Sequence, residues 1–241
     1  MATVSPDRDL RLDLFRGLAL WLIFLDHIPS NAVSWITIRN YGFSDATEIF
    51  VFISGYTAAF VYGRAMHEHG FIVAGARVLN LFAYTGTLGR ACEAAGARAI
   101  WEVDRSTAAL ELGERVHVAD PARHTWIAAD VFAWLPALDP AERFDLVIVD
   151  PPSMTSRVAQ VPEVLAAYRR LYRQVARHVA PGGAIAACCC TSRVARATFR
   201  STVGGALGRA FALEAELPPE PDHPVGFPEA DYLKITLWRR R

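Results

Sequence analysis

Residues 76–241 alternate between short apolar runs and longer stretches in which apolar positions recur every three to four residues. Such short runs are typical of buried strands, and the longer stretches are typical of amphipathic helices. The pattern predicts strands over residues 76–82, 98–104, 124–130, 144–152, 182–190, 211–217 and 232–240. It predicts helices over residues 87–97, 106–118, 131–138, 161–180 and 193–210.

This alternation of strands and helices predicts an α/β fold with a mostly parallel, doubly wound, Rossmann-like sheet. The last two strands follow one another without a helix-like stretch, so we expect them to form an antiparallel hairpin at the edge of the sheet. Ligands of such sheets bind beyond the carboxyl ends of the strands. The chemistry of the protein is therefore expected at those positions.

The chain changes character near residue 75, which predicts a domain boundary between residues 74 and 75. The first part has two apolar runs, Gly17–Leu25 and Ile49–Gly63, both shorter than the roughly 20 residues that span a bilayer. Buried helices, interfacial segments and, with flanking residues, membrane spans remain open, so residues 14–63 are a candidate for membrane association. Arginines flank the pair of runs, as in a hairpin that tethers a cytoplasmic domain to the inner membrane, although Arg39 between the runs weakens this interpretation.

Composition places the chain among globular proteins, because 52% of its 241 residues are hydrophobic and 21% are charged. The net charge is zero, but the last third has more arginines than acids, which suits either a phosphate-bearing partner or ordinary solvated helix faces. Four cysteines argue against a secreted disulfide scaffold and for a reducing compartment.

Polar and flexible residues follow the predicted strands in order. After the first strand, Gly86 and Gly89 permit a tight turn and close backbone approach before a helix. The second strand ends in Asp104, where an acid typically accepts hydrogen bonds from ribose hydroxyls. The third ends in Asp130, which can meet an adenine edge or simply cap the next helix. Together with the "DPP" at residues 150–152, these positions favour a nucleoside cofactor. S-adenosylmethionine fits better than NAD, because no triple-glycine loop is present to hold a pyrophosphate.

Three adjacent cysteines, Cys188 to Cys190, end the fifth predicted strand. Adjacent cysteines rarely form disulfides, and no second pair exists to complete a zinc site, so no metal is expected. A nucleophile and a set of small core residues both remain open. Because side chains alternate along a strand, Cys188 and Cys190 share one face, and only Cys190 reaches the carboxyl end beside Asp150.

The segments "VLNLFAYTGTLGRACEAAGA", "FDLVIVDPPSM", "CCCTSR" and "DHPVGFPEADYLK" resemble the class I RNA cytosine-5 methyltransferases that act on large-subunit ribosomal RNA. The resemblance covers about residues 76–241. It implies S-adenosylmethionine as cofactor and ribosomal RNA as substrate. The cofactor-binding residues that it implies are Phe82, Tyr84, Thr85, Gly86, Asp104 and Asp130.

The same resemblance implies that Cys190 is the nucleophile. A thiolate that adds to C6 of cytosine makes C5 nucleophilic toward the sulfonium methyl group, and loss of the C5 proton then expels the thiolate. Asp150 is expected to hydrogen-bond the polar edge of the base, with Pro151 and Pro152 shaping the substrate-binding loop. Enzymes that methylate amino groups often have an aromatic residue after the two prolines, and the serine at this position, Ser153, disfavours that chemistry.

The N-terminal segments "RDLRLDLFRGLALWLIFLDHIPSN" and "FSDATEIFVFISGYTAAFVYGRAM" resemble the start of the OpgC-type membrane acyltransferases. Arg16 and His27 match an Arg-x10-His pattern of that family. Two helices cannot build the acyltransferase site, so we do not predict acyl transfer. The leading hypothesis is a cytosine-5 RNA methyltransferase, and the alternative is a non-catalytic chimera of an acyltransferase fragment with a cofactor-binding domain.

Overall fold

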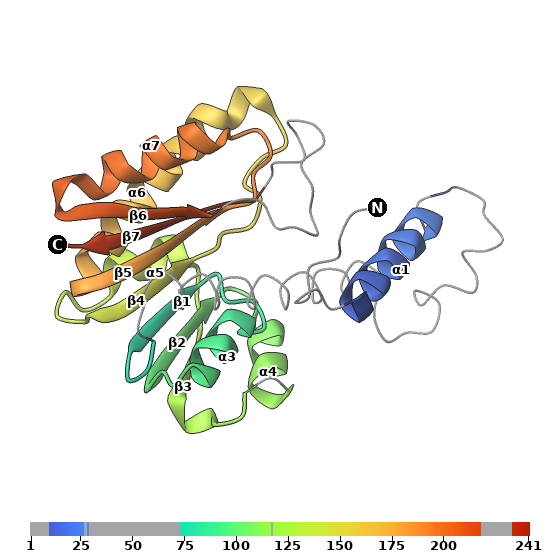
Figure 1. Ribbon diagram of the computed structural model, residues 1–241, viewed down its shortest axis with the longest axis horizontal. Coiled ribbons are helices and arrows are strands. Elements are labelled where there is room, and N and C mark those ends of the chain that lie inside the picture. The colour runs from blue at the N-terminus through green and yellow to red at the C-terminus, as the bar shows by residue number, and fades with distance from the viewer. Residues whose placement is uncertain (1–9, 27, 29–72, 117, 218–232) are drawn as a thin grey trace. The chain divides into compact units, whose positions relative to one another are not determined.

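A computed structural model describes residues 10–26, 28, 73–116, 118–217 and 233–241 (Figure 1). The chain divides into two compact units, residues 1–61 and 62–241. The first unit contributes one described helix, α1 (Leu10–Asp26). The second contains the remaining described helices and strands.

Helix α1 covers the first apolar run and exposes several large hydrophobic side chains. These are Leu14, Phe15, Leu18, Leu20, Trp21 and Phe24. Among the described residues, no helix is both long and apolar enough to cross a membrane. His27 and the second apolar run, residues 49–63, lie outside the described residues.

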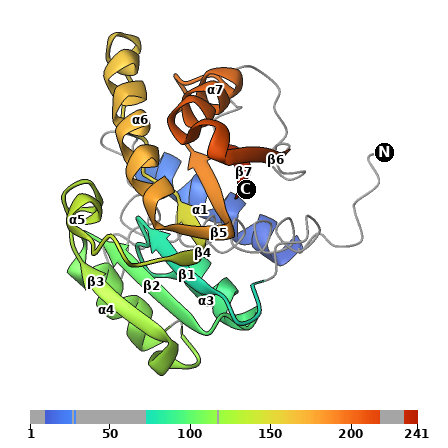
Figure 2. The same cartoon turned by 90° about the vertical axis from the view of Figure 1, so that its left-hand side faces the viewer.

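The second unit is built on one seven-stranded sheet in the order β3-β2-β1-β4-β5-β7-β6 (Figures 1 and 2). The strands are β1 (Arg77–Leu81), β2 (Ala99–Asp104), β3 (His124–Ala128), β4 (Phe144–Val149), β5 (Val179–Cys189), β6 (Phe211–Leu217) and β7 (Lys234–Arg240). The helices of the unit are α3 (Thr87–Ala94), α4 (Thr107–Val116), α5 (Val131–Ala137), α6 (Val161–His178) and α7 (Arg196–Leu207), with short 3-10 turns at η3 (Pro121–Arg123), η4 (Val158–Gln160) and η5 (Gly208–Ala210).

Strands β1 to β5 run parallel, and β7 pairs antiparallel with both β5 and β6. This arrangement confirms the predicted doubly wound sheet with an antiparallel hairpin at its edge. The hairpin folds back so that β7, the last strand of the chain, lies against β5 and leaves β6 at the edge.

Several observed boundaries differ from the predicted ones by a few residues. One of them lies between the helix that was predicted to end at residue 180 and the strand that was predicted to begin at residue 182. Helix α6 stops at His178, and β5 begins at Val179 and continues through a Pro-Gly-Gly sequence. The strand accommodates this sequence by a register shift against β4 between Phe144 and Leu146, with Gly182 at φ +73°. A bulge of this kind lets a strand continue through residues that usually end one.

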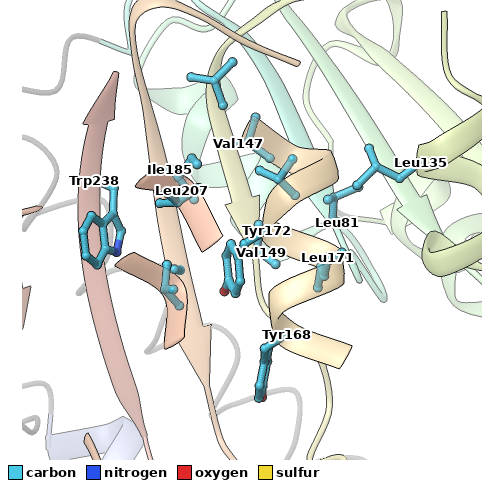
Figure 3. Close-up of a cluster of buried hydrophobic side chains, with 14 of the residues drawn as sticks. Leu81, Leu135, Val147, Val149, Tyr168, Leu171, Tyr172, Ile185, Leu207 and Trp238 are labelled. Atoms are coloured by element: carbon cyan, nitrogen blue, oxygen red, sulfur yellow. The ribbon is translucent and has the colours of Figure 1, made fainter. Parts of the chain in front are cut away.

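The two faces of the sheet have different neighbours. One face packs against α5, α6 and α7 in a large apolar core that includes Leu81, Val149, Tyr168, Ile185 and Trp238 (Figure 3). Since side chains alternate along a strand, the neighbours of these core residues point to the opposite face, where α3 and α4 pack on β1 to β3. That second face carries buried polar groups, described below.

Candidate active site

The carboxyl ends of β1 to β5 lie in a row along one end of the sheet, and this row of strand ends is called the edge below. Backbone hydrogen bonds connect several of these strand ends. The amide of Ala83 donates to the carbonyl of Val103 at 3.1 Å, and the amide of Ala129 donates to the carbonyl of Asp104 at 2.8 Å. The predicted site residues follow these strand ends. The fold therefore brings them to one edge, as the sequence pattern predicted.

The turn between β1 and α3 has an unusual backbone. Phe82 and Tyr84 have φ values of 63° and 51°, in the left-handed region that non-glycine residues rarely occupy, and Gly86 follows at 73°. Such conformations cost about 1–3 kcal/mol each for non-glycine residues and cluster at ligand-binding segments. Phe82 also packs edge-on against Phe132 at 5.8 Å between ring centroids, whereas Tyr84 is exposed.

Asp104 holds this turn from the end of β2. One carboxylate oxygen accepts a hydrogen bond from the amide of Tyr84 at 2.9 Å, and the other accepts one from the amide of Ser106 at 2.8 Å. An ionised carboxylate has about four lone-pair sites. Asp104 can therefore fix the two loops and still accept hydrogen bonds from a ligand.

A buried polar group lies beneath the turn, and sequence reasoning missed it. Glu102 is fully buried and accepts a hydrogen bond from Asn80 Nδ2 at 2.7 Å, while its other oxygen lies 3.1 Å from His124 Nδ1. Burial raises the pKa of Glu102, and the hydrogen bonds from His124 and Asn80 oppose this rise. A Cβ atom on Gly89 would lie 1.6 Å from Glu102 Oε1, so only glycine lets α3 approach this carboxylate.

Asp130 is exposed and acts as the N-cap of α5, where its side chain accepts a hydrogen bond from the amide of Ala133 at 3.1 Å. This is the capping role that the sequence left open beside adenine recognition. Thr85 is buried, and its hydroxyl lies 3.2 Å from that of Thr87 at the start of α3. Asp130 and Thr85 therefore each lie between the end of a strand and the start of the helix that follows it.

The second part of the edge contains Asp150, Pro151, Pro152 and Cys190. The thiol of Cys190 donates to the carbonyl oxygen of Pro151 at 3.4 Å, so the ends of β4 and β5 are in direct contact. Pro151 is buried and Pro152 is exposed. The structure thus brings together the four residues that the sequence predicted for catalysis and substrate binding.

The carboxyl group of Asp150 and the thiol of Cys190 both have raised pKa values. Burial raises the pKa of Asp150 to about 6. Burial, and then the charge of Asp150, raise the pKa of Cys190 to about 12. Cys188 and Cys189 are fully buried, as expected for core residues. In the protein alone, the surrounding protein atoms and a nearby carboxylate both disfavour the thiolate of Cys190.

Two further residues near Cys190 were given no role from the sequence. Lys234 is fully buried on β7 and donates to the carbonyls of Thr191 and Val194. Tyr168 is fully buried on α6, and burial raises the pKa of its hydroxyl. Among the described residues, no group of histidine, cysteine, aspartate and glutamate is arranged to hold a metal ion.

Comparisons with known proteins match different parts of the chain. A family model described as OpgC protein matches residues 8–89. The chain is 35% identical over 170 residues to a ribosomal RNA large subunit methyltransferase of Deinococcus radiodurans, covering 68% of this chain and 42% of that protein. It is 33% identical over 179 residues to ribosomal RNA large subunit methyltransferase I of Shewanella amazonensis, covering 70% of this chain and 45% of that protein. The chain therefore spans less than half the length of these relatives.

Among solved structures, SMU.776, named as a methyltransferase and complexed with SAH, matches with a TM-score of 0.61 and 25% identity, covering 72% of this chain and 48% of that chain. The fold is the Rossmann-like class I methyltransferase fold. In this methyltransferase fold the strained turn after β1 and the acid after β2 occupy the strand ends at which α/β sheets bind ligands. The pair Asp150 and Cys190 lies at the neighbouring strand ends of the same edge.

Proposed function

We propose that residues 75–241 form an S-adenosylmethionine-dependent methyltransferase domain that methylates C5 of cytosine in large-subunit ribosomal RNA through a covalent adduct with Cys190. The observation that carries the proposal is the contact between Cys190 Sγ and the Pro151 carbonyl, 3.4 Å apart, which brings a thiol beside Asp150 at the ligand-binding edge. The relatives named as ribosomal RNA methyltransferases support the substrate class.

The residues around the turn after β1 fit the proposed cofactor. Asp104 has lone pairs left to accept ribose hydroxyls after its bonds to Tyr84 and Ser106. The strained backbone at Phe82 and Tyr84 is typical of a segment shaped for a ligand. S-adenosylmethionine would supply the electrophilic methyl group, and these residues would bind and orient its nucleoside part.

Cys190 would add as a thiolate to C6 of the cytosine, so that the electron pair of the C5–C6 bond becomes available at C5. C5 would then attack the methyl group that the proposed cofactor supplies, and loss of the C5 proton to water would expel the thiolate and restore the ring. The raised pKa of Cys190 means that the thiol is protonated in the protein alone at neutral pH. A positive charge close to the sulfur, such as the sulfonium of the proposed cofactor, would favour its ionisation.

Asp150 suits a role at the polar edge of the base. With its pKa raised to about 6, a small further shift decides between the ionised form, which accepts from the cytosine amino group, and the protonated form, which donates to N3. Donation to N3 would withdraw electrons from the ring while the thiolate adds to C6. The adjacent prolines, Pro151 and Pro152, limit the conformations of the loop that carries this carboxyl group.

Exposed arginines in the loop after β4 and along α6 support RNA as the partner. The loop after Pro152 and the solvent face of α6 expose Arg157, Arg169, Arg170, Arg173 and Arg177. Within the part of the chain that the structure describes, none of the five forms an ion pair with an acidic side chain. Exposed arginines that lack acidic partners suit phosphate contacts, which position an RNA without specifying its sequence.

A transfer assay tests the proposal directly. The full chain is incubated with methyl-labelled S-adenosylmethionine and large-subunit ribosomal RNA, and the modified nucleosides are identified by mass spectrometry. We expect 5-methylcytidine, which Cys190→Ala abolishes while cofactor binding by calorimetry stays unchanged. Methylation at another atom, or full activity in the Cys190→Ala variant, would contradict the assignment of Cys190 as nucleophile.

The OpgC match over residues 8–89 favours a second candidate, because it occupies the part of the chain that precedes and enters the methyltransferase fold. In this alternative, residues 1–74 form an OpgC-like helical segment fused to a domain that binds cofactor without turnover. Calorimetry would then show binding of S-adenosylmethionine, and the transfer assay would show no product on any RNA. Detection of 5-methylcytidine that depends on Cys190 would reject this second candidate.

A further inference from the structure

Lys234 is a fully buried lysine at the start of β7, close to the proposed nucleophile. Its ammonium donates hydrogen bonds to the carbonyl oxygens of Thr191 at 2.8 Å and Val194 at 2.9 Å. A buried ammonium is costly unless hydrogen bonds compensate it, so residues of this kind usually have a specific role. The two carbonyls belong to the turn that begins directly after Cys190.

Thr191 extends this contact to the loop that carries Asp150. Its side chain is fully buried, and its hydroxyl accepts a hydrogen bond from the amide of Met154 at 3.2 Å. Lys234, Thr191 and Met154 therefore link β7, the end of β5 and the loop after β4 in one chain of hydrogen bonds. The strand register adds a second constraint, because Lys234 pairs directly with Cys189, the residue before Cys190.

Several charged or titratable groups act on the Cys190 thiol. Burial has the largest effect and disfavours the ionised form, as do Asp150 and Cys189, while a backbone hydrogen bond and, after it, the charge of Lys234 favour that form. Tyr168 packs nearby on α6, and its buried hydroxyl stays protonated because its own pKa is raised. Lys234 thus opposes the carboxylate of Asp150 at the same sulfur.

We propose that Lys234 is a positioning residue for Cys190, which holds the turn from Thr191 to Val194 in place and stabilises the thiolate form of Cys190. This inference rests on the proposed function only for its role in methyl transfer. The effect on the thiol itself is a property of the protein without RNA or cofactor. A purely structural lysine would satisfy the two carbonyls and leave the reactivity of Cys190 unchanged.

Alkylation of Cys190 by iodoacetamide measures this effect, because the thiolate displaces iodide and forms a stable thioether. The full chain is treated over pH 7 to 10, and peptide mass spectrometry follows the peptide that contains Cys190, with Cys190→Ser identifying the signal. We expect Lys234→Gln to slow alkylation at pH 8 at least about tenfold and to move the pH profile upward by at least about one unit. We expect Lys234→Arg, which retains the charge, to keep the profile closer to that of the unchanged chain.

Two further variants separate the explanations. Thr191→Val removes the hydroxyl that accepts from Met154 and keeps Lys234, so we expect its alkylation profile to move less than that of Lys234→Gln. Arg239→Gln removes a half-exposed cation from the other end of β7 and should leave the profile unchanged. If Lys234→Gln is poorly folded, as judged by circular dichroism, Thr191→Val and Lys234→Arg still test the idea, since equal losses in both would mean that packing alone matters.

The outcome is independent of the transfer assay. A shifted alkylation profile in a chain that methylates no RNA would retain the role of Lys234 and reject the proposed function. A profile unchanged by Lys234→Gln in a folded chain, with methyl transfer intact, would overturn the role of Lys234 and retain the proposed function.

Discussion

Two carboxylates at the same edge of the sheet have opposite surroundings. Asp104, at the end of β2, accepts hydrogen bonds from two backbone amides at 2.8 and 2.9 Å. Asp150, at the end of β4, accepts no hydrogen bond from any residue that the structure describes, and burial raises its pKa to about 6. The backbone hydrogen bonds of the first carboxylate suit the proposed binding of the cofactor, whereas the raised pKa of the second suits the proposed proton exchange with the base.

The parts of the sheet behind these two carboxylates also differ, because one is polar and the other is apolar. Behind the turn after β1, Glu102 meets Asn80 and His124 in a buried polar group against α3. Behind Asp150 and Cys190 lies the apolar core with Tyr168 and its neighbours on α6 (Figure 3). Polar support fixes a binding turn, and apolar surroundings shift the pKa values of reactive groups. We therefore expect substitutions near β1 and β2 to weaken cofactor binding, and those near β4 and β5 to slow transfer.

The largest effect is expected for Gly89→Ala, which attacks the support of the binding turn. The added Cβ would lie 1.6 Å from Glu102 Oε1, so the buried carboxylate or α3 must move. We expect about 2–4 kcal/mol lower stability in denaturant unfolding and more than about 100-fold weaker binding of S-adenosylmethionine by calorimetry.

Gly205→Ala is a matched control in α7, because a Cβ there would meet nothing within 4 Å. Alanine is a better helix former than glycine, so the control should gain up to about 1 kcal/mol of stability. Normal cofactor binding by Gly89→Ala would break the assignment of the β1 side of the edge to the cofactor.

The second effect concerns Asp150→Asn, which should slow methyl transfer about 100-fold while cofactor affinity changes less than about threefold. The same substitution should raise the stability of the fold, although it slows methyl transfer. Because the folded pKa of about 6 lies above the ordinary value of 3.8, Asp150 favours folding below pH 3.8, and this contribution is lost as pH rises through 6. At about 1.4 kcal/mol per pKa unit, Asn should raise stability at pH 8 by up to about 3 kcal/mol and by almost nothing at pH 3.5.

Urea unfolding of both proteins at several pH values measures this difference, and it requires no RNA or cofactor. A stability gain that is equal at pH 3.5 and pH 8 would show that ionisation of Asp150 is not the cause. Weakened cofactor binding with unchanged transfer would reverse the proposed contrast between Asp104 and Asp150.

A smaller effect is expected for Asp104→Asn. Asparagine has one acceptor oxygen, so it cannot accept from both Tyr84 and Ser106 as the carboxylate does. We expect about tenfold weaker binding of S-adenosylmethionine, with the transfer rate at saturating cofactor little changed. Asp139→Asn is the control, since the side chain of exposed Asp139 accepts a hydrogen bond from the amide of Ala141 in its own loop. Equal losses in both variants would mean that Asp104 has no special role.

The edge of the sheet could be predicted well because that information is local in the sequence. Each strand end is marked by the residue that stops an apolar run, so the amino-acid pattern alone assigns Asp104, Asp150 and Cys190 to the ends of strands. The alternation of side chains also separates Cys190 from the two core cysteines that precede it. The exact end of α6 was missed, because a register shift lets β5 run through Gly182.

The supporting groups could not be predicted, since their partners meet only through the register of the sheet. Glu102 is 22 residues from both Asn80 and His124, and within its strand it looks like any polar residue among apolar ones. Lys234 is 43 residues from Thr191, and a lysine at the start of a strand is usually exposed. The burial of these charges becomes visible only when the strands are paired.

The smallest effects are expected for the arginines of α6, which test whether RNA also contacts the exposed face of this helix. Arg169→Gln and Arg173→Gln should each weaken binding of ribosomal RNA about two- to fivefold. Each should also reduce the slope of log affinity against log salt by about 0.7–0.9, since one phosphate contact is lost. Arg209→Gln, an exposed arginine beyond the end of α7, should leave the slope unchanged. A reduction common to all three variants would indicate a general effect of net charge, and RNA binding would then have no preferred path along α6.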